Sequence, residues 1–530
     1  MKSPFLPDWV LAHAKRHASA PAVASPEARL SYGDLAERMR VLSARLAASG
    51  VGPGERVLIA LPNVPASVVA GLALQALGAC VVEMNRQWGA DVFKAVAEQT
   101  QARHAFVLGR DARTWGHVAR SRPLRFWVVH PAELTAALRD ALGGGAAAWL
   151  REDGRLDLAA GPAGSAKAPV DRRPESPALI LYTSGSTGKP RGVVQTFRNI
   201  DANTRSIVEY LGLGAADRAM LILPLSYCYG RSVLQTHLFA GGSVFLDNRF
   251  MYPRVVLEAL GAEGCTGFAG VPATFEIIRR QVEMSSLSFP RLRYLTQAGG
   301  AMAPDTIAWV RLAFHPARLF VMYGQSEATS RLSYLPPERA EDKHGSIGIA
   351  IPGVELEVVD GDGVEIAPGE VGHLVARGDN VTLGYLDEPE ETAAILRDGW
   401  LWTGDLAWRD ADGFFFHVGR SKEILKIGGH RVSPVEIEHA LERHPEVAEA
   451  AVVGLKSDLA GEAAAAFVVR RQGSAVSEVE LRRFCRQLLP AFKVPGTITF
   501  VDALPRNQAG KLLRAEVAAR GLPASAREGP

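Results

Sequence analysis

A run of glycines, hydroxyl groups and cations follows an apolar segment in the first half of the chain. The apolar segment 178–181 reads Ala-Leu-Ile-Leu, and the run at 182–192 reads Tyr-Thr-Ser-Gly-Ser-Thr-Gly-Lys-Pro-Arg-Gly. Glycine lets the backbone turn tightly and bring N–H groups close to an anion, while hydroxyl and cationic side chains supply further donors. The sequence therefore predicts a strand that leads into a polyphosphate-binding loop. The residues predicted to hold the phosphates are Thr183, Ser184, Gly185, Ser186, Thr187, Gly188 and Lys189.

Two other interpretations of this run are weaker. A Walker A loop requires glycine at the position of Thr183 and a serine or threonine at the position of Pro190, so that pattern is absent. A flexible Ser/Thr/Gly-rich linker remains an alternative, but flexible linkers seldom follow a buried strand directly.

Three further apolar segments end in distinct motifs, which indicates how the chain positions them. These segments are 219–223 before Pro224, 294–296 before Gln-Ala-Gly-Gly, and 319–322 before Tyr-Gly-Gln-Ser-Glu. In open parallel sheets, ligands bind beyond the carboxyl ends of the strands. We therefore expect these motifs and the phosphate-binding loop to meet in one crevice.

Together with three later motifs, this set resembles the adenylate-forming superfamily, which includes acyl-CoA synthetases, peptide-synthetase adenylation domains and beetle luciferases. The later motifs are Thr-Gly-Asp at 403–405, Gly-Arg-Ser-Lys at 419–422 and Gly-Lys at 510–511, in the order that the family has them. The chain is closest in type to acyl- or aryl-CoA ligases. The resemblance implies ATP and Mg²⁺ as cofactors and a carboxylic acid as substrate.

The resemblance also implies a role for each motif. Glu327 would hold Mg²⁺, Asp405 would accept hydrogen bonds from the ribose hydroxyls, and Arg420 would contact the ribose or a phosphate. Lys511 would bind the carboxylate and α-phosphate oxygens during adenylation. The catalytic residues implied are Lys511, Thr187, Glu327 and Lys426. The residues implied to pack the adenine are Gly299, Gly300, Ala301, Tyr323, Gly324, Gln325 and Ser326.

Taken alone, some of these motifs allow other interpretations. Glu327 could be a solvent-exposed glutamate at the end of a strand. Residues 324–328 could also be a degenerate nucleophile elbow, with alanine in place of the final glycine. Gly-Gly pairs occur in any tight turn, and a lysine after glycine in a polar loop is usually just solvated.

A second half-reaction is implied by the segment after Arg420. In the family, the small domain rotates after adenylation, and here Lys422 would be the hinge. Lys426, Gly428 and Gly429 would then face the adenylate, where the paired glycines leave room for a pantetheine arm. The thiol would come from CoA or from the phosphopantetheine of a separate carrier protein.

The sequence defines the carboxylic acid substrate less tightly than the nucleotide. Amino-acid-activating relatives carry an aspartate in the motif that corresponds to 224–230, and this chain has none there. A fatty or aryl acid is therefore expected, in an apolar pocket lined by Tyr227, Tyr229, Val271 and Met302. Three positions depart from the family pattern: Tyr227 and Phe197 stand where histidine is usual, and Arg191 stands where lysine is commoner.

Alternating strand-like and helix-like runs predict an α/β fold with mostly parallel sheets. We expect a large N-terminal domain over 1–421, with a β-rich lobe from residue 371, and a small mobile α+β C-terminal domain over 422–530. A helix is expected at 30–48. Two further helices are predicted to begin with capping boxes, one at Ser433 and the other at Ser477.

The overall composition excludes several classes of protein. A net charge of +2, without blocks of like charge, gives no indication of nucleic-acid binding. Four scattered cysteines without a CxxC pair indicate neither a disulfide framework nor a zinc site, so the cytoplasm is the expected location. Residues 57–82 carry no charge, but Pro62 and Pro65 divide them, which predicts a strand, a turn and a buried helix rather than a membrane span.

These expectations combine into one leading hypothesis, an AMP-forming acid–thiol ligase that makes an acyl-adenylate and then an acyl thioester with CoA. Its alternative is a stand-alone adenylating enzyme that loads a separate carrier protein. From a different class, a non-catalytic nucleotide-binding protein is the third hypothesis.

Overall fold

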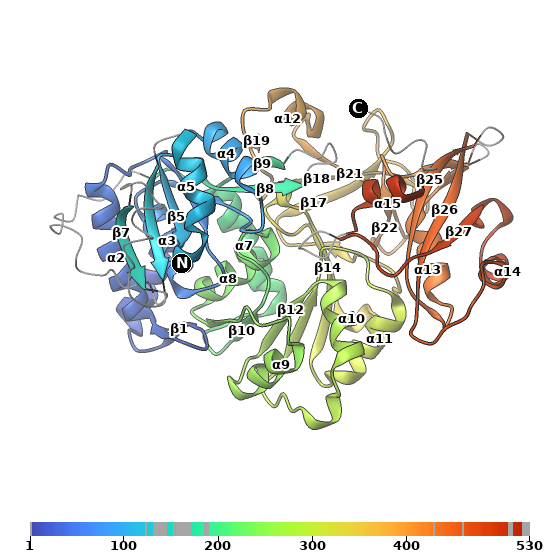
Figure 1. The fold of residues 1–530 in the computed structure, drawn as a ribbon, viewed down its shortest axis with the longest axis horizontal. Coiled ribbons are helices and arrows are strands. Elements are labelled where there is room, and N and C mark those ends of the chain that lie inside the picture. Colours follow the sequence, from blue (N-terminus) through green and yellow to red (C-terminus); the bar gives the residue numbers. More distant parts are fainter. Residues whose placement is uncertain are drawn as a thin grey trace.

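The computed structural model describes residues 3–121, 124–130, 146–151, 154, 172–184, 190–427, 430–457, 461–506 and 512–521. Figure 1 shows two α/β layers at the N-terminal side, a β-rich lobe, and a separate C-terminal α+β unit at the right. The predicted fold class is confirmed. The predicted domain boundary between residues 421 and 422 stays a prediction.

The first sheet is parallel from β7 to β8 and ends in the antiparallel strands β9 and β19. Its strands, in spatial order, are β19 (Gly384–Tyr385), β9 (Pro190–Thr196), β8 (Pro177–Ser184), β4 (Cys80–Glu83), β3 (Arg56–Ala60), β5 (His104–Leu108), β6 (Arg125–His130) and β7 (Ala146–Arg151). The strand predicted at 178–181 is therefore β8, beside the centre of this sheet.

The second sheet carries the other three strand-end motifs. Strands β14, β13, β12, β10, β11 and β1 run parallel, and antiparallel strands close both edges. In spatial order they are β16 (Ile349–Ala350), β15 (Ser333–Leu335), β14 (Arg318–Tyr323), β13 (Tyr294–Gln297), β12 (Gly267–Gly270), β10 (Arg218–Leu221), β11 (Ser243–Leu246), β1 (Pro21–Ala24) and β2 (Arg29–Ser31). The motifs after β10, β13 and β14 thus share one edge of one sheet.

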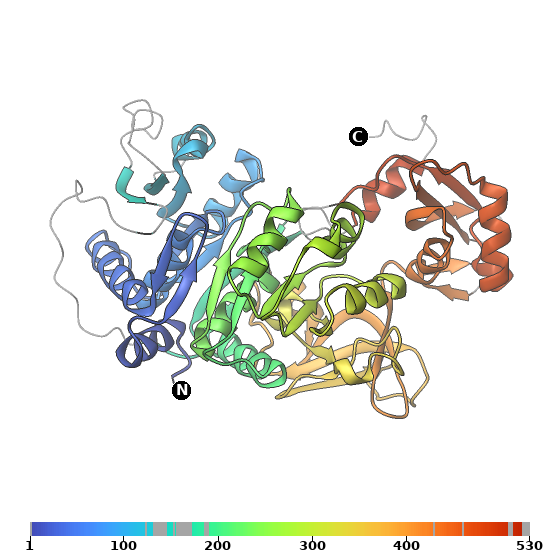
Figure 2. The ribbon, with the colours of Figure 1, turned by 90° about the horizontal axis from the view of Figure 1, so that it is seen from below.

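Helices fill the space between these two sheets and cover their outer faces (Figures 1 and 2). The helix α3 (Pro65–Ala76) is apolar on all sides because nearly every residue in it is buried in the core that both sheets share. No described helix is long and apolar enough to cross a membrane. The other helices of the N-terminal layers are α1 (Leu6–Arg16), α2 (Tyr32–Ala48), α4 (Ala90–Gln99), α5 (Ala112–Ser121), α7 (Phe197–Leu211), α8 (Cys228–Ala240), α9 (Pro253–Ala262), α10 (Pro272–Gln281) and α11 (Pro304–Ala313).

The β-rich lobe begins earlier than predicted, at β17 rather than at residue 371. Valine and leucine alternate with glutamate along the first half of β17, and this period of two is the sequence signal of the strand. The strands of the lobe are β17 (Val354–Val359), β18 (Gly372–Gly378), β21 (Trp400–Arg409), β20 (Leu396–Arg397) and β22 (Phe415–Arg420), with the helix α12 (Pro389–Ile395) beside them.

In the described part of the C-terminal unit, three helices pack on a fourth sheet. Its elements are β23 (Leu425–Ile427), β24 (His430–Val432), α13 (Pro434–Glu442), β25 (Val447–Ser457), β26 (Gly461–Arg470), α14 (Glu478–Leu488), β27 (Thr497–Phe500) and α15 (Arg514–Gly521). One contact with the N-terminal layers is made by Arg280 of α10, whose guanidinium donates to the carbonyl of Ala448 over 2.9 Å.

The predicted helix starts are correct, but one capping box is wrong. Ser31 and Ser477 each form a capping box with the residue three positions later. Ser433 lies at the N-cap of α13, yet its hydroxyl donates to the carbonyl of Val418 instead of capping the helix. This tertiary hydrogen bond replaces the local one and joins α13 to β22.

Candidate active site

The predicted phosphate-binding loop connects two antiparallel strands. Thr183 of β8 pairs with Arg191 of β9, and Ser184 pairs with Pro190. Residues 185–189 and the side chain of Ser184 lie outside the described residues, so the roles of Gly185, Ser186, Thr187, Gly188 and Lys189 stay predictions.

Arg191, at the base of this hairpin, forms ion pairs with α12 and with the residue before it. Its guanidinium lies 3.2 Å from the carboxylate of Glu388 and 2.8 Å from that of Glu391, and it lies over the ring of Tyr385 at 5.5 Å. The sequence suggested a phosphate donor. In the structure this cation fixes the segment after β19 to the hairpin, and its role toward the phosphates stays a prediction.

The hairpin also contacts the Tyr-Gly-Gln-Ser-Glu motif. Gln195 of β9 donates to the carbonyls of Ser326 and Thr329 over 3.0 and 3.2 Å. Thr382 donates its N–H to the carbonyl of Glu327 over 2.8 Å, and its hydroxyl bonds the carbonyl of Val194 in β9. The two motifs therefore lie side by side although they come from different sheets.

Glu327, whose role as a Mg²⁺ ligand stays a prediction, lies within hydrogen-bond reach of a tyrosine of β19. The hydroxyl of Tyr385 donates to its carboxylate over 2.8 Å, and burial followed by the nearby Glu327 charge raises the pKa of this tyrosine. The described residues contain no group of three or more metal-binding side chains. The single carboxylate of Glu327 is a donor that fits Mg²⁺, because the ion usually binds one or two carboxylates and takes its other ligands from substrate phosphates and water. Tyr385 was missed by sequence reasoning.

Asp405 is the centre of a charged network at the end of β14. Its side chain is 2% exposed; one oxygen accepts from Tyr323 over 2.5 Å, and the other lies 2.9 Å from Arg420 and 3.3 Å from His417. The antiparallel register of β21 and β22 places Asp405 directly opposite Arg420. The structure thus brings together three residues that the sequence predicted separately, and adds His417.

This network keeps Asp405 ionised. Burial alone would raise the pKa of its carboxyl group, but Arg420 and His417 more than offset that effect, so the pKa lies below its usual value. The charge of Asp405 in turn holds the pKa of Arg420 above its usual value despite burial. An ionised carboxylate is the acceptor that a ribose diol requires.

We expect Asp405→Asn to raise the KM for ATP about tenfold, because it removes a charged acceptor whose hydrogen bonds contribute about 1.5 kcal/mol or more. Steady-state kinetics with varied ATP would measure this. Tyr323→Phe is the matched control, since it removes one neutral donor and leaves the carboxylate charged. If both variants raised KM equally, the charge of Asp405 would have no role in binding ATP.

The structure requires glycine at the predicted adenine-binding positions for different reasons. Gly299 has φ 90°, and a Cβ there would lie 2.5 Å from the hydroxyl of Tyr227. A Cβ on Gly324 would lie 2.0 Å from the carbonyl of Ser330, so this glycine is required by backbone packing. Gly300 and Ala301 are exposed, as a stacking surface for a base must be. Nε2 of Gln325 is buried without a partner among the described residues, which fits a polar group that awaits a ligand.

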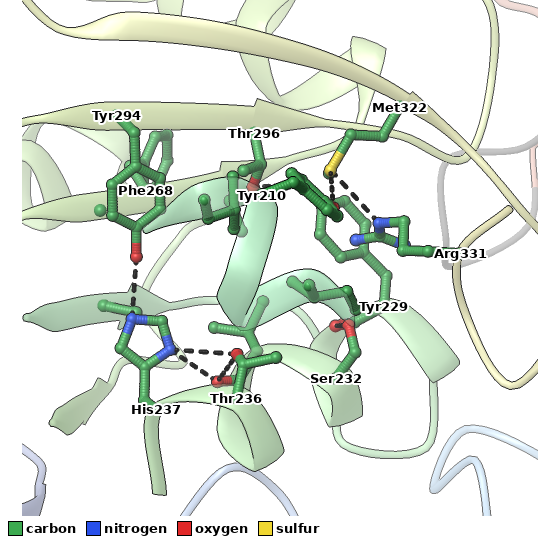
Figure 3. A pocket seen from close by; sticks show the side chains of 16 residues that line it. Tyr210, Tyr229, Ser232, Thr236, His237, Phe268, Tyr294, Thr296, Met322 and Arg331 are labelled. Carbon is green, nitrogen blue, oxygen red and sulfur yellow. Dashed lines mark hydrogen bonds between the residues drawn. The ribbon is translucent and has the colours of Figure 1, made fainter. Parts of the chain in front are cut away.

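Behind these motifs lies a narrow cavity, between the helices α7 and α8 and the second sheet (Figure 3). Tyr229 lines it and donates to the hydroxyl of Thr296 over 2.7 Å. The rings of Tyr229 and Tyr227 meet edge to face at 6.3 Å. Of the other predicted pocket residues, Val271 lies beside Gly299, and Met302 is buried in the core that includes residues of α10 and α11.

The remaining predictions fall on the C-terminal unit. Lys422 and Lys426 are exposed, the first in the turn after β22 and the second on β23. Gly428, Gly429 and Lys511 lie outside the described residues. Phe197, the other departure, is buried at the start of α7 with its ring edge-on to Phe5 at 5.0 Å, which leaves it no polar role.

Comparison with known proteins gives the context of this geometry. Residues 10–386 match the AMP-binding enzyme family, and residues 436–511 match the AMP-binding enzyme C-terminal domain. Feruloyl-CoA synthase of an Amycolatopsis species is 32% identical over 98% of this chain and 100% of its own length. Sulfoacetate–CoA ligase of Cupriavidus necator is 31% identical, over 93% of both chains.

Among solved structures, o-succinylbenzoate coenzyme A synthetase of Bacillus subtilis in complex with ATP and magnesium ion superposes with a TM-score of 0.82. It is 25% identical and covers 96% of this chain and 99% of its own. These comparisons confirm the predicted superfamily and the prediction of an AMP-forming acid–thiol ligase. By its family match, by relatives that span its length and by its fold, the chain belongs to the AMP-binding enzyme family.

Proposed function

We propose that this enzyme uses ATP and Mg²⁺ to join a small carboxylic acid to CoA. One observation carries the proposal. Tyr323, Asp405 and Arg420 form a single network at the end of β14, and the metal-binding candidate Glu327 comes four residues after Tyr323 in the chain. The names of the relatives support CoA as the thiol, since both curated relatives are CoA-dependent by name. Because the reaction consumes ATP and CoA, we also expect the enzyme in the cytoplasm.

In the first half-reaction, a carboxylate oxygen of the acid attacks the α-phosphorus of ATP. The bond from this phosphorus to the bridging oxygen breaks, and pyrophosphate leaves. Asp405 and Arg420 hold the ribose side of the nucleotide, and Lys511 stabilises the negative charge that develops at the α-phosphate. Glu327 would hold Mg²⁺, which neutralises charge on the phosphates when bound.

In the second half-reaction, the thiol sulfur attacks the acyl carbon of the adenylate. The bond from this carbon to the phosphate oxygen breaks, AMP leaves, and the thiol proton is lost. Lys426, Gly428 and Gly429 belong to this step. Lys422 is the hinge about which the C-terminal domain turns between the two steps, since a few residues in a loop suffice for such a change.

The cavity supports a small acid over a long-chain fatty acid. The volume of the cavity is about 20 Å³, so it admits little more than one small group. The name of one curated relative is for an aromatic acid and that of the other is for a sulfonated two-carbon acid, so neither name is for a long-chain fatty acid.

The purified enzyme with ATP, Mg²⁺, CoA and a panel of small acids provides the test. We expect pyrophosphate release with at least one acid, followed by the acyl-CoA of that acid in the mass spectrum. Acyl-AMP that persists while CoA stays unmodified would instead support a carrier protein as the acceptor. No pyrophosphate release with any acid would favour a non-catalytic protein.

A further inference from the structure

Arg331 is a buried cation on the wall of the cavity, and it has no carboxylate partner among the described residues. Its side chain is 3% exposed. Nη1 donates to the hydroxyl of Ser330 over 2.8 Å, and Nε points at the sulfur of Met322 at 3.3 Å. The guanidinium carbon lies 4.1 Å from the ring centroid of Tyr229. These neutral partners satisfy some of its donors but leave its charge uncompensated.

Arg231, a second buried arginine in the same layers, shows what such a charge normally requires. Arg231 is 2% exposed, and its guanidinium lies 3.0 Å from the carboxylate of Glu83, which is as deeply buried. A buried charge without a counterion destabilises the fold, so buried arginines are normally paired. The comparison indicates that the counterion of Arg331 is supplied from outside the protein.

The backbone before Arg331 is held in a strained turn that directs it inward. Thr329 has φ 63°, which is unfavourable for a β-branched residue. The hydroxyl of Thr329 donates to the carbonyl of Asn380 over 2.6 Å, and the side-chain amide of Gln195 donates to the carbonyl of Thr329 over 3.2 Å. Strain of this kind persists where the surrounding contacts fix it, and it is commonest at ligand sites. These contacts therefore hold Arg331 in its inward position.

The cavity also lies where the tail of an activated acid must extend. Thr296 on its wall comes immediately before the Gln-Ala-Gly-Gly motif, and Met322 comes immediately before Tyr323. Figure 3 shows Arg331 and Met322 at the same end of the cavity as Tyr229. A series of contacts joins the two sites: Gly299 lies beside the hydroxyl of Tyr227, the ring of Tyr227 meets that of Tyr229, and the guanidinium of Arg331 lies over the ring of Tyr229.

The chemistry of the wall selects for one kind of group. Among the described residues that line the cavity, Arg331 is the only arginine or lysine, and none is an aspartate or glutamate. Burial lowers the pKa of His237, which also lines the cavity and accepts from the hydroxyl of Tyr294 over 2.8 Å, so this histidine is neutral. The hydroxyl of Tyr210 lies beside Arg331, at 3.0 Å from the sulfur of Met322, and is a second donor at that end.

We propose that the preferred substrate is a small acid with a second anionic group, a carboxylate or a sulfonate, which Arg331 binds in the cavity while the first carboxylate is adenylated. This inference rests on the proposed function and names its substrate class. The second group replaces the missing counterion, and the small volume of the cavity excludes long chains. Arg331 is a specificity-determining residue in this reaction.

The test compares diacids with mono-acids of equal length in ATP–pyrophosphate exchange. The pairs are malonate with propanoate, succinate with butanoate, and glutarate with pentanoate. Wild-type enzyme is expected to favour at least one diacid, and Arg331→Met is expected to lower the diacid-to-mono-acid ratio of kcat/KM about tenfold or more, the loss typical of a charge-assisted hydrogen bond. Arg331→Lys keeps the charge and should retain part of the preference. Arg40→Met, at an exposed position of α2, should leave the ratio unchanged.

Several outcomes would overturn the proposal. The wild type could show no preference for any diacid, or Arg331→Met could lower both members of a pair equally, which would place Arg331 on the reacting carboxylate. The Tm of the ligand-free enzyme is a second measurement, which detects misfolding of the variant. Replacing an unpaired buried charge by methionine should not lower this Tm. A clear fall would show that the charge is already compensated within the protein. If no acid supports exchange, the proposed function itself fails; if only mono-acids do, this inference alone fails.

Discussion

Lys511→Ala is expected to slow adenylation by about a hundredfold or more, the loss typical when a preorganised charge contact to the transition state is removed. The ammonium group stabilises negative charge on the α-phosphate and orients the incoming carboxylate. ATP–pyrophosphate exchange with the best acid from the panel measures this step alone. An unchanged exchange rate would remove Lys511 from the mechanism.

Lys426→Ala is the matched control, because it removes an ammonium group of the same domain that is assigned to the other half-reaction. It should preserve pyrophosphate exchange and slow the appearance of acyl-CoA. Single-turnover experiments that start from preformed acyl-AMP would isolate the second step. Equal losses of both steps in this variant would contradict the assignment of the two lysines to two conformations.

Glu83→Gln is expected to lower the free energy of unfolding by about 3–5 kcal/mol, because it leaves the guanidinium of Arg231 buried without its counterion. The pair joins β4 to α8 across the shared core, with side chains 2% and 3% exposed. Burial raises the pKa of Glu83 and lowers that of Arg231, since both lose contact with water. Urea denaturation followed by tryptophan fluorescence would measure the change.

Two controls separate this effect from the loss of any ion pair. Glu37→Gln breaks the exposed pair of Glu37 and Arg40, whose side chains are 59% and 62% exposed, and should lower the stability much less than Glu83→Gln does. A double change of Glu83 and Arg231 to methionine removes both charges and should recover most of the stability. A loss in Glu83→Gln no larger than in Glu37→Gln would mean that water reaches the pair.

The sequence was sufficient for features that depend on local pattern. The strand at 178–181, the helix beginning at Tyr32 and the buried helix after Pro65 all follow from periodicity, caps and breakers. The order of the motifs was sufficient to predict the superfamily. Two of the partners of Asp405 could also be predicted from the sequence, because the motifs that contain Tyr323 and Arg420 are both assigned to the nucleotide.

What the sequence could not predict are contacts that depend on how the sheets are placed against one another. Tyr385 lies 58 positions from Glu327, and Glu83 lies 148 positions from Arg231, so no local pattern relates them. The failed capping box at Ser433 has the same cause, because Val418 competes for its hydroxyl. One signal was present: Glu83 directly follows the uncharged stretch 57–82, and a charge that ends a buried strand requires a partner.

The pairing of Arg191 with Glu388 and Glu391 has a consequence for how the family varies. A planar guanidinium reaches two carboxylates at once, whereas the ammonium group of a lysine is a single point charge. Among homologues, a lysine at the position of Arg191 should therefore accompany the loss of one of these two glutamates. The residue in the phosphate hairpin and the residues before and within α12 would then change together over evolutionary time, although almost two hundred positions separate them.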